Sequence, residues 1–150
     1  MADEPNVGLL LFLPYRAMEN RVLRRLADAG FGDVTLAQAR LFQRIGPDGT
    51  RLTELAEQAQ VTKQTAGFLV DQLERAGYVR RTPDPADARA RLVRIAERGA
   101  AAVEVAAAVV AEVEAEWTAH IGARRMGQLR QALVRLREVT DADRRREEIG

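Results

Sequence analysis

The side chains best suited to recognising another molecule fall in one stretch of the chain, between Thr62 and Arg98. Lys63 and Gln64 directly follow a threonine that is well placed to cap a helix. Glutamine pairs with adenine through N6 and N7, and lysine donates to O6 or N7 of guanine. The free backbone amides of a first helical turn can also bind a phosphate. The chemistry that these residues offer is therefore recognition of nucleic acid.

Arginines gather just after this segment. Two strand-like runs, Tyr78–Thr82 and Arg91–Ile95, flank a loop rich in Pro, Asp and Arg. Arginines on a mobile loop can enter a narrow, electronegative minor groove. The formal net charge of the chain is only +1, so any attraction to DNA must come from such local clustering. The cluster contains Arg80, Arg81, Arg89, Arg91, Arg94 and Arg98. The alternative is that the exposed Lys and Gln side chains are merely solvated and that the arginines pair with nearby acids.

Catalytic chemistry is not supported by the residues. The chain has no cysteine and a single histidine, His120, which has no Ser or Cys partner in a recognisable spacing. Thiolate and histidine metal clusters are therefore excluded. The glycines form no phosphate loop and the carboxylates are scattered. We expect no enzyme activity, no metal and no cofactor.

Two helices and a hairpin must position the polar and basic side chains. Residues 53–59 and 62–76 read as amphipathic helices capped by Thr53 and Thr62, with a turn between them and Gly77 as a C-terminal cap. Helix, turn, helix and hairpin in this order predict a winged helix-turn-helix. The first helix should bury Leu55 and Ala56, and the second Ala66, Leu69, Val70 and Leu73. The opposite face of the second helix should carry Lys63, Gln64, Gly67, Phe68 and Asp71.

Further helices are predicted on both sides of this domain. Residues 7–29 have a helical period interrupted by Pro14, which either kinks one helix, the interpretation we favour, or starts it. Thr35 should cap a helix over 36–45, and residues 50–52 should add a short strand to the hairpin. After the hairpin we expect a long helix over 97–120, a break at Gly122, a helix from Arg124 to about Thr140 and a frayed tail over 141–150.

The apolar surface of these outer helices exceeds what one small winged domain can cover, which predicts an interface with a second copy. Packing of the helices on their own subunit is the alternative. Trp117 and His120 are expected to belong to the core of the dimer rather than to a sensor site. The residues expected at the interface are Leu9, Leu13, Val110, Val113, Trp117, Leu129, Leu133 and Leu136.

The run from Val61 to Gly99, VTKQTAGFLVDQLERAGYVRRTPDPADARARLVRIAERG, resembles the MarR family of bacterial transcription regulators. It is similar to the family's recognition helix, the glycine after that helix, and a wing with an Asp-x-Arg element, here Asp87-Ala88-Arg89. The outer helices also fit the family in length and order. The resemblance implies one domain over 1–150, with a winged helix-turn-helix at about 35–96 and dimerisation helices at about 6–30 and 97–140. The fold class is thus mainly α with a small β-hairpin wing.

The resemblance also implies a function, namely a homodimer that binds a palindromic operator in double-stranded DNA. Many such proteins are repressors that a small aromatic or anionic ligand releases. By this likeness Arg89 is the arginine at the tip of the wing. The DNA-binding residues would be Thr62, Lys63, Gln64, Thr65, Gly67, Phe68, Arg89 and Arg91. A ligand pocket would be lined by Phe12, Tyr15, Arg16 and Phe42, with an ordinary aromatic core as the alternative.

The chain departs from the family pattern at several positions. Gly67 and Phe68 stand where polar or basic residues are common, so contact with a thymine methyl could replace some base contacts. Ala96 stands where Thr or Ser often caps the long helix, and Gly99 lowers the helix propensity of its first turn. The gapped face at Gly67 and Phe68 leaves one alternative function, a helical protein-binding adaptor with little affinity for DNA.

The location is expected to be cytoplasmic. The apolar run 7–13 is too short to span a bilayer, and acidic residues precede it where a signal peptide would have basic ones.

Overall fold

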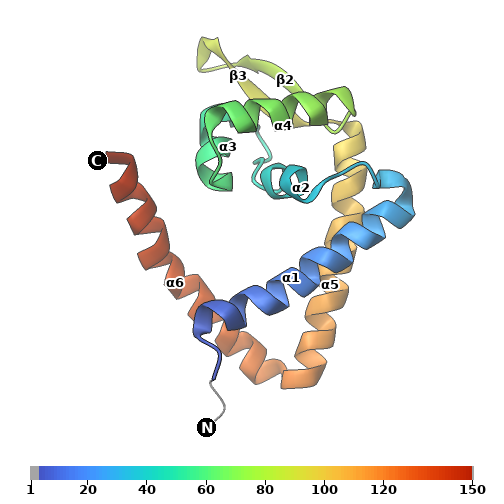
Figure 1. Ribbon diagram of the computed structural model, residues 1–150, viewed down its shortest axis with the longest axis vertical. Helices are drawn as coiled ribbons and strands as arrows, with labels where there is room; N and C mark the ends of the chain where they lie inside the picture. Colours follow the sequence, from blue (N-terminus) through green and yellow to red (C-terminus); the bar gives the residue numbers. More distant parts are fainter. Residues whose placement is uncertain (1–3, 150) are drawn as a thin grey trace. The chain divides into compact units, whose positions relative to one another are not determined.

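The computed structural model describes residues 4–149, with side chains described up to Asp141. The chain divides into two compact units, Met1–Val109 and Val110–Gly150. The architecture is mainly helical with one three-stranded antiparallel sheet, which confirms the predicted fold class (Figure 1). The elements in order are α1 Val7–Leu26, η1 Ala27–Phe31, α2 Leu36–Phe42, β1 Thr50–Arg51, α3 Leu52–Ala59, α4 Lys63–Arg75, β2 Val79–Asp84, β3 Asp87–Ile95, α5 Glu97–Ile121 and α6 Ala123–Ile149.

The core of the first unit lies where α2, α3 and α4 pack on one another and on the sheet (Figure 1). Apolar residues three or four positions apart share one face of a helix, so each of these helices turns one stripe inward. The predicted inward residues of α3 and α4 are all buried, which confirms the helical phase read from the sequence. These residues are Leu55, Ala56, Ala66, Leu69, Val70 and Leu73.

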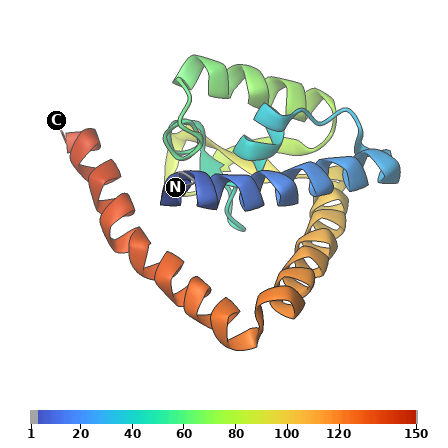
Figure 2. The same cartoon turned by 60° about the horizontal axis from the view of Figure 1, so that its bottom comes forward.

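Helix α1 begins at Val7 and continues through Pro14. Figure 2 shows it as one unbroken helix. The helix therefore does not start at Pro14. Its first turn is capped by Asn6, whose side-chain oxygen accepts from the amide of Leu9 at 2.9 Å. At its other end the helix widens into the turn η1, in which Gly30 adopts a positive φ of 97°. That conformation suits glycine and ends the helix close to the predicted place.

Helix α2 starts as predicted but ends earlier. Thr35 and Gln38 form a reciprocal capping box, which confirms Thr35 as the cap. The predicted end at Ile45 was wrong, because the amides of Arg44 and Ile45 donate to carbonyl oxygens three residues back and close tight turns. The chain then makes the predicted turn over 46–49 and enters β1, which pairs with β3 as expected.

Helix α3 starts at Leu52, directly after β1, and Arg51 at its N-cap makes no side-chain capping bond. The prediction that Thr53 caps this helix was therefore wrong. Since the chain passes from strand to helix without a loop, Thr53 already lies inside the first turn. The helix ends at Gln60, which has the left-handed backbone conformation with φ of 57°. The predicted turn at Gln60 and Val61 is confirmed.

The hairpin is longer than predicted. Strands β2 and β3 are joined by only Pro85 and Ala86, so the expected mobile loop belongs largely to the strands. A local anchor explains the difference, because the buried carboxylate of Asp84 accepts from the amide of Ala86 at 2.9 Å. The same carboxylate pairs with Arg51 of β1 at 2.7 Å. In the sheet β3 lies between β1 and β2.

The first turn of α5 packs tightly against the start of β2. The amide of Ala96 donates to the carbonyl oxygen of Tyr78 at 2.9 Å. A Cβ atom on Gly99 would overlap that carbonyl oxygen, and it would lie 3.1 Å from side-chain atoms of both Ile95 and Phe42. The close approach thus explains why glycine occupies position 99 in spite of its low helix propensity.

The remaining helices follow the predicted order, with a break at Gly122, whose φ is 91°. Helix α6 continues beyond Thr140 to Ile149, through the segment expected to be a frayed tail. Along α5 the buried apolar side chains are Ala102, Val109 and Val113, whereas Val103 and His120 are exposed. Within the described helices, none is long and apolar enough to cross a membrane.

Candidate nucleic-acid interface

The first turn of α4 presents Lys63 and Gln64 to solvent. Thr62 caps this helix as predicted, because its hydroxyl accepts from the amide of Thr65 at 3.0 Å. The Thr62 hydroxyl also donates to the hydroxyl of Thr65 at 3.0 Å, so these two side chains hold each other. Lys63 and Gln64 are exposed and have no side-chain partner in the part of the chain that the structure describes. They are the polar groups of this turn that remain available to a ligand.

Further along α4 the outward face changes in character. The buried residues of α4 define its inner side, and Gln64, Phe68 and Asp71 follow at spacings of four and three on the side opposite. Phe68 is 60% exposed. Gly67 is half-buried at the edge of this face, where an added Cβ would meet Leu52 of α3 at 3.7 Å. An aromatic ring therefore occupies the middle of the outermost stripe.

Three of the six clustered arginines are committed to contacts within the first unit. Arg81 donates to Asp71 at 2.8 Å and to Glu74 at 2.9 Å, which fastens β2 to α4. Arg94 donates to the hydroxyl of Thr82 at 2.9 Å. Arg98 belongs to a network at the far end of α4. The alternative in which arginines pair with nearby acids is therefore correct for Arg81 and Arg98.

The other three, Arg80, Arg89 and Arg91, are exposed. None of their guanidinium groups has a partner among the residues with described side chains. Arg89 lies in β3, and its backbone amide donates to Asp87 at 3.0 Å. The hairpin thus carries its uncommitted cations on strands, and the sequence-based picture of arginines on a mobile loop was wrong in that respect.

The tip of the hairpin is held by Asp84. The pKa of this carboxyl is lowered, first by the hydrogen bond from the Ala86 amide and then by that from Arg51. Both favour the ionised form of Asp84. The tight turn and the attachment of β2 to Arg51 of β1 consequently depend on the same carboxylate.

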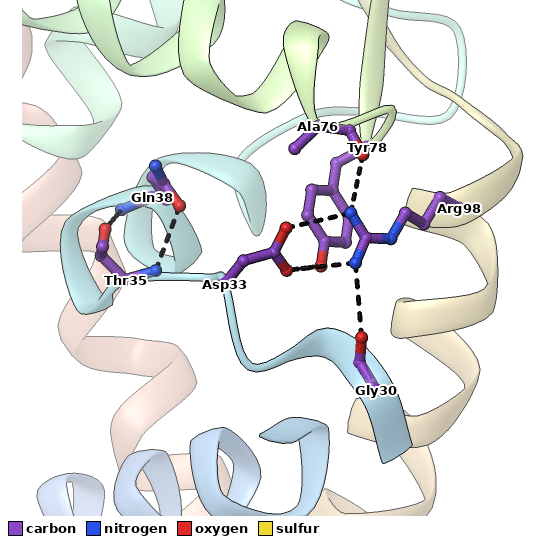
Figure 3. A network of polar contacts seen from close by, with 7 residues as sticks. All are labelled: Gly30, Asp33, Thr35, Gln38, Ala76, Tyr78 and Arg98. Carbon is purple, nitrogen blue, oxygen red and sulfur yellow. Dashed lines mark hydrogen bonds and ion pairs between the residues drawn. The ribbon is translucent and has the colours of Figure 1, made fainter. Parts of the chain in front are cut away.

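A polar network centred on Arg98 holds the C-terminal end of α4 (Figure 3). The guanidinium of Arg98 donates to both carboxylate oxygens of Asp33, at 3.0 and 3.2 Å. It also donates to the carbonyl oxygens of Ala76, at 2.8 Å, and Gly30, at 3.3 Å. Its carbon lies 4.4 Å from the centre of the Tyr78 ring, within the range of a cation–π contact. One side chain of α5 thus connects the end of α4 to the segment between α1 and α2.

Tyr78 completes the network, with its ring beside the guanidinium of Arg98 and its hydroxyl at the carboxylate of Asp33 (Figure 3). Its hydroxyl donates to Asp33 at 2.5 Å. This hydrogen bond is the main reason that the pKa of Asp33 is lowered, with the bond from Arg98 adding to it. Burial, followed by the bond to Asp33, raises the pKa of Tyr78 to about 12. Sequence analysis missed this network, although Arg98 stood out as the last arginine of the basic cluster.

The residues predicted to line a ligand pocket divide between surface and core. Phe12, Tyr15 and Arg16 of α1 are exposed, whereas Phe42 is half-buried and packs against the core cluster. The Tyr15 hydroxyl accepts from Gln43, just after α2, at 3.4 Å. A separate open hollow of about 580 Å³ lies beside the first turn of α4, between α3 and α4. It is lined by Ala56, Glu57, Gln60, Val61, Thr62 and Thr65.

Helix α1 of the first unit and helix α6 of the second unit each expose several large apolar side chains. Of the residues predicted at a dimer interface, those on α1 and α6 are exposed, Val110 and Trp117 are half-buried, and Val113 is buried within its own chain. The large apolar side chains exposed on α1 are Val7, Leu9, Leu10, Leu11, Phe12, Leu13 and Tyr15, and those on α6 are Leu129, Leu133, Val134, Leu136 and Val139.

Helices α3 and α4, the turn between them and the hairpin after them define a winged helix-turn-helix protein. Comparison with known families agrees, because the model of the MarR family matches residues 32–90. This segment therefore resembles the winged helix domain of the MarR family, and the chain as a whole has the fold of MarR-family transcriptional regulators. Comparison with curated proteins gave no match.

Solved structures resemble nearly the whole chain. A transcriptional regulator from Thermotoga maritima is 28% identical, with 91% of this chain and 94% of that chain covered and a TM-score of 0.61. A MarR family protein from Mycobacterium tuberculosis, in complex with salicylic acid, is also 28% identical, with 91% and 99% covered and a TM-score of 0.63. A mutant of MepR from S. aureus, bound to an oligodeoxyribonucleotide, is 20% identical, with 91% and 99% covered and a TM-score of 0.58. This last likeness shows the fold alone.

Proposed function

We propose that this protein is a transcriptional regulator that binds a specific sequence of double-stranded DNA through α4 and the β2–β3 hairpin. One observation carries the proposal. The exposed first turn of α4, with Lys63 and Gln64, is followed by a hairpin whose Arg80, Arg89 and Arg91 have no partner in the described part of the chain. A helix of this kind fits the major groove, and arginines beside it can bind the phosphates or the minor groove.

The division of the arginines supports this assignment. An arginine that is already paired contributes little to phosphate binding, since its donors are in use. Arg81, which fastens β2 to α4, would set the angle of the hairpin, while Arg89 and Arg91 would contact DNA. The contact between the hairpin and the phosphate backbone of the DNA should be largely electrostatic. The affinity of the protein for DNA should therefore fall as the salt concentration rises.

The protein would act as a homodimer. The apolar side chains exposed on α1, and separately those exposed on α6, are of the kind that usually marks an interface. Two symmetric copies of α4 would match half-sites about one helical turn, roughly 34 Å, apart in a palindromic operator. Repression is the mode of action that follows if the dimer blocks transcription at such an operator.

A small aromatic anion is the effector that we propose. The relative from Mycobacterium tuberculosis binds salicylic acid, and this chain exposes Phe12, Tyr15 and Arg16 together on α1. Aromatic rings and one guanidinium suit a ligand of that class. Regulation of transcription would place the protein in the cytoplasm.

The test starts from duplexes enriched by binding to the protein from a random pool. On the enriched duplex, Arg89→Ala should weaken binding and reduce its dependence on salt by about one phosphate contact. Lys63→Ala should also change the preferred bases, because Lys63 lies where base edges are read. Arg124→Ala, an exposed arginine of α6, is the charge-matched control and should bind as wild type does. Wild-type binding by both Arg89→Ala and Lys63→Ala would refute the proposed interface.

The alternative function, a protein-binding adaptor, has the exposed ring of Phe68 as its support. An adaptor would show no salt-dependent binding to any duplex of the pool. The same experiment therefore separates the two functions.

A further inference from the structure

We infer that Phe68 reads the methyl group of a thymine in the major groove, and so determines part of the sequence specificity. This inference rests on the proposed function, because it requires α4 to lie in the groove. Its starting point is the position of the ring at the middle of the outermost stripe of α4, where it is 60% exposed. A phenyl ring left in water at that place forgoes the free energy of burial unless a ligand covers it.

The neighbours of Phe68 leave its ring as the main apolar group that this face of α4 can offer to a ligand. In the outermost stripe, Asp71 is bonded to Arg81 at 2.8 Å, which neutralises its carboxylate and occupies one oxygen. Gly67, next to the ring, has no side chain and so adds no bulk beside it. Gln64 and Phe68 are therefore the two uncommitted side chains in the N-terminal half of the stripe, one polar and one apolar, and exposed Arg75 lies at its C-terminal end.

The chemistry of the groove identifies what the ring would contact. On the floor of the major groove the bases offer hydrogen-bond donors and acceptors, and the apolar group among them is the C5-methyl of thymine. A second protein could also cover the ring of Phe68. However, α4 carries free polar groups in the preceding turn, and these favour a partner surface that offers both hydrogen-bonding groups and methyl groups. Duplex DNA has that mixture.

The spacing on the helix gives the inference a sequence signature. Phe68 lies four positions after Gln64, which corresponds to about 6 Å along the helix axis at about 1.5 Å per residue. Neighbouring base pairs are about 3.4 Å apart along a strand. If Gln64 pairs with an adenine, the thymine read by Phe68 should lie within about two base pairs of that adenine.

The experiment removes the methyl group from the DNA and the ring from the protein, separately and together. On the enriched duplex, each thymine of one half-site is replaced in turn by deoxyuridine, which differs by the methyl group alone. At one thymine the replacement should weaken wild-type binding about fourfold, as expected for one buried methyl group. Phe68→Ala should bind deoxyuridine and thymine equally at that position, so that the two changes are fully coupled.

Matched controls keep the result specific. Gln64→Ala should bind the duplex more weakly but retain the fourfold effect of deoxyuridine, because Gln64 contacts an adenine and not the thymine that Phe68 contacts. Phe68→Leu should retain part of the effect, since it keeps an apolar side chain. Since Phe68 is exposed, unfolding curves of Phe68→Ala should match those of the wild type, which excludes misfolding as the cause.

Each outcome bears on one claim. If the wild type binds the duplex but every deoxyuridine affects it and Phe68→Ala equally, the ring does not read a methyl group and the inference is wrong. The same holds if no thymine lies within about two base pairs of the adenine that Gln64→Ala ceases to prefer. If no duplex is enriched at all, the proposed function itself fails, and the inference fails with it.

Discussion

Two glycines in helices provide a sharp test of the packing described here. Gly99 in the first turn of α5 and Gly67 in α4 are both helical, and alanine should improve the intrinsic helix propensity at either position by about 1 kcal/mol. The space around them differs. A Cβ at Gly67 would make an ordinary contact with Leu52 at 3.7 Å, whereas a Cβ at Gly99 would overlap the carbonyl oxygen of Tyr78.

The magnitudes follow from these surroundings. At Gly99 the obstacle is backbone, and relief of the overlap would disturb the hydrogen bond from Ala96 to Tyr78, worth about 1 kcal/mol. Crowding of a packed site costs roughly 1 to 3 kcal/mol in addition. After the gain in propensity, Gly99→Ala should be about 1 to 3 kcal/mol less stable than wild type. Gly67→Ala should be about 0.5 to 1 kcal/mol more stable, because glycine in a helix is unfavourable by that amount.

Urea unfolding followed by circular dichroism measures both changes. Protein concentration must be the same for all variants, since the stability of a dimer depends on it. The midpoint should fall for Gly99→Ala and rise for Gly67→Ala, with the slope unchanged. Equal stability of Gly99→Ala and Gly67→Ala would mean that α5 does not approach the carbonyl oxygen of Tyr78 as closely as the structure shows. Close packing would then not explain the glycine at position 99.

Two further predictions concern individual hydrogen bonds. The pKa of Tyr78 is raised to about 12, so its contribution to stability is complete below pH 10, the ordinary tyrosine value, and is lost as the pH rises from 10 to about 12. Unfolding measured across this range should show a loss of roughly 2 to 3 kcal/mol in the wild type that Tyr78→Phe lacks; parallel curves for the two proteins would contradict the assignment. Thr62→Ala should lower the free energy of unfolding by roughly 1 kcal/mol through loss of the α4 cap. Thr62→Asp, which can also cap, should restore most of this stability in the same urea assay, and equal stability of all three proteins would show that the cap contributes nothing.

The parts of the fold that were predictable from the sequence are those determined by local interactions. Thr35 and Thr62 bond to amides three residues away, and the inward residues of α3 and α4 follow from helical periodicity. The predicted cap at Thr53 failed because the strand before it runs straight into the helix, and a capping residue is recognisable only where a loop precedes the helix.

The features that sequence analysis missed depend on residues far apart in the chain. The segment of Pro, Asp and Arg looked like a loop, yet the pairing of Asp84 with Arg51 and the amide of Ala86 closes it into a hairpin. Arg98 looked like one more basic residue for DNA, but its guanidinium is bound by Asp33, which is far from it in sequence. The uncommitted arginines could be separated from the committed ones only once these partners were known.

The central claim is that α4 and the hairpin recognise a specific duplex as part of a two-fold dimer. The most direct measurement is the enrichment of duplexes from a random pool by the wild-type protein, followed by sequencing. We predict one palindromic motif with half-sites centred about one helical turn, roughly 34 Å, apart. A pool that shows no enriched motif after repeated selection at low salt would contradict the account.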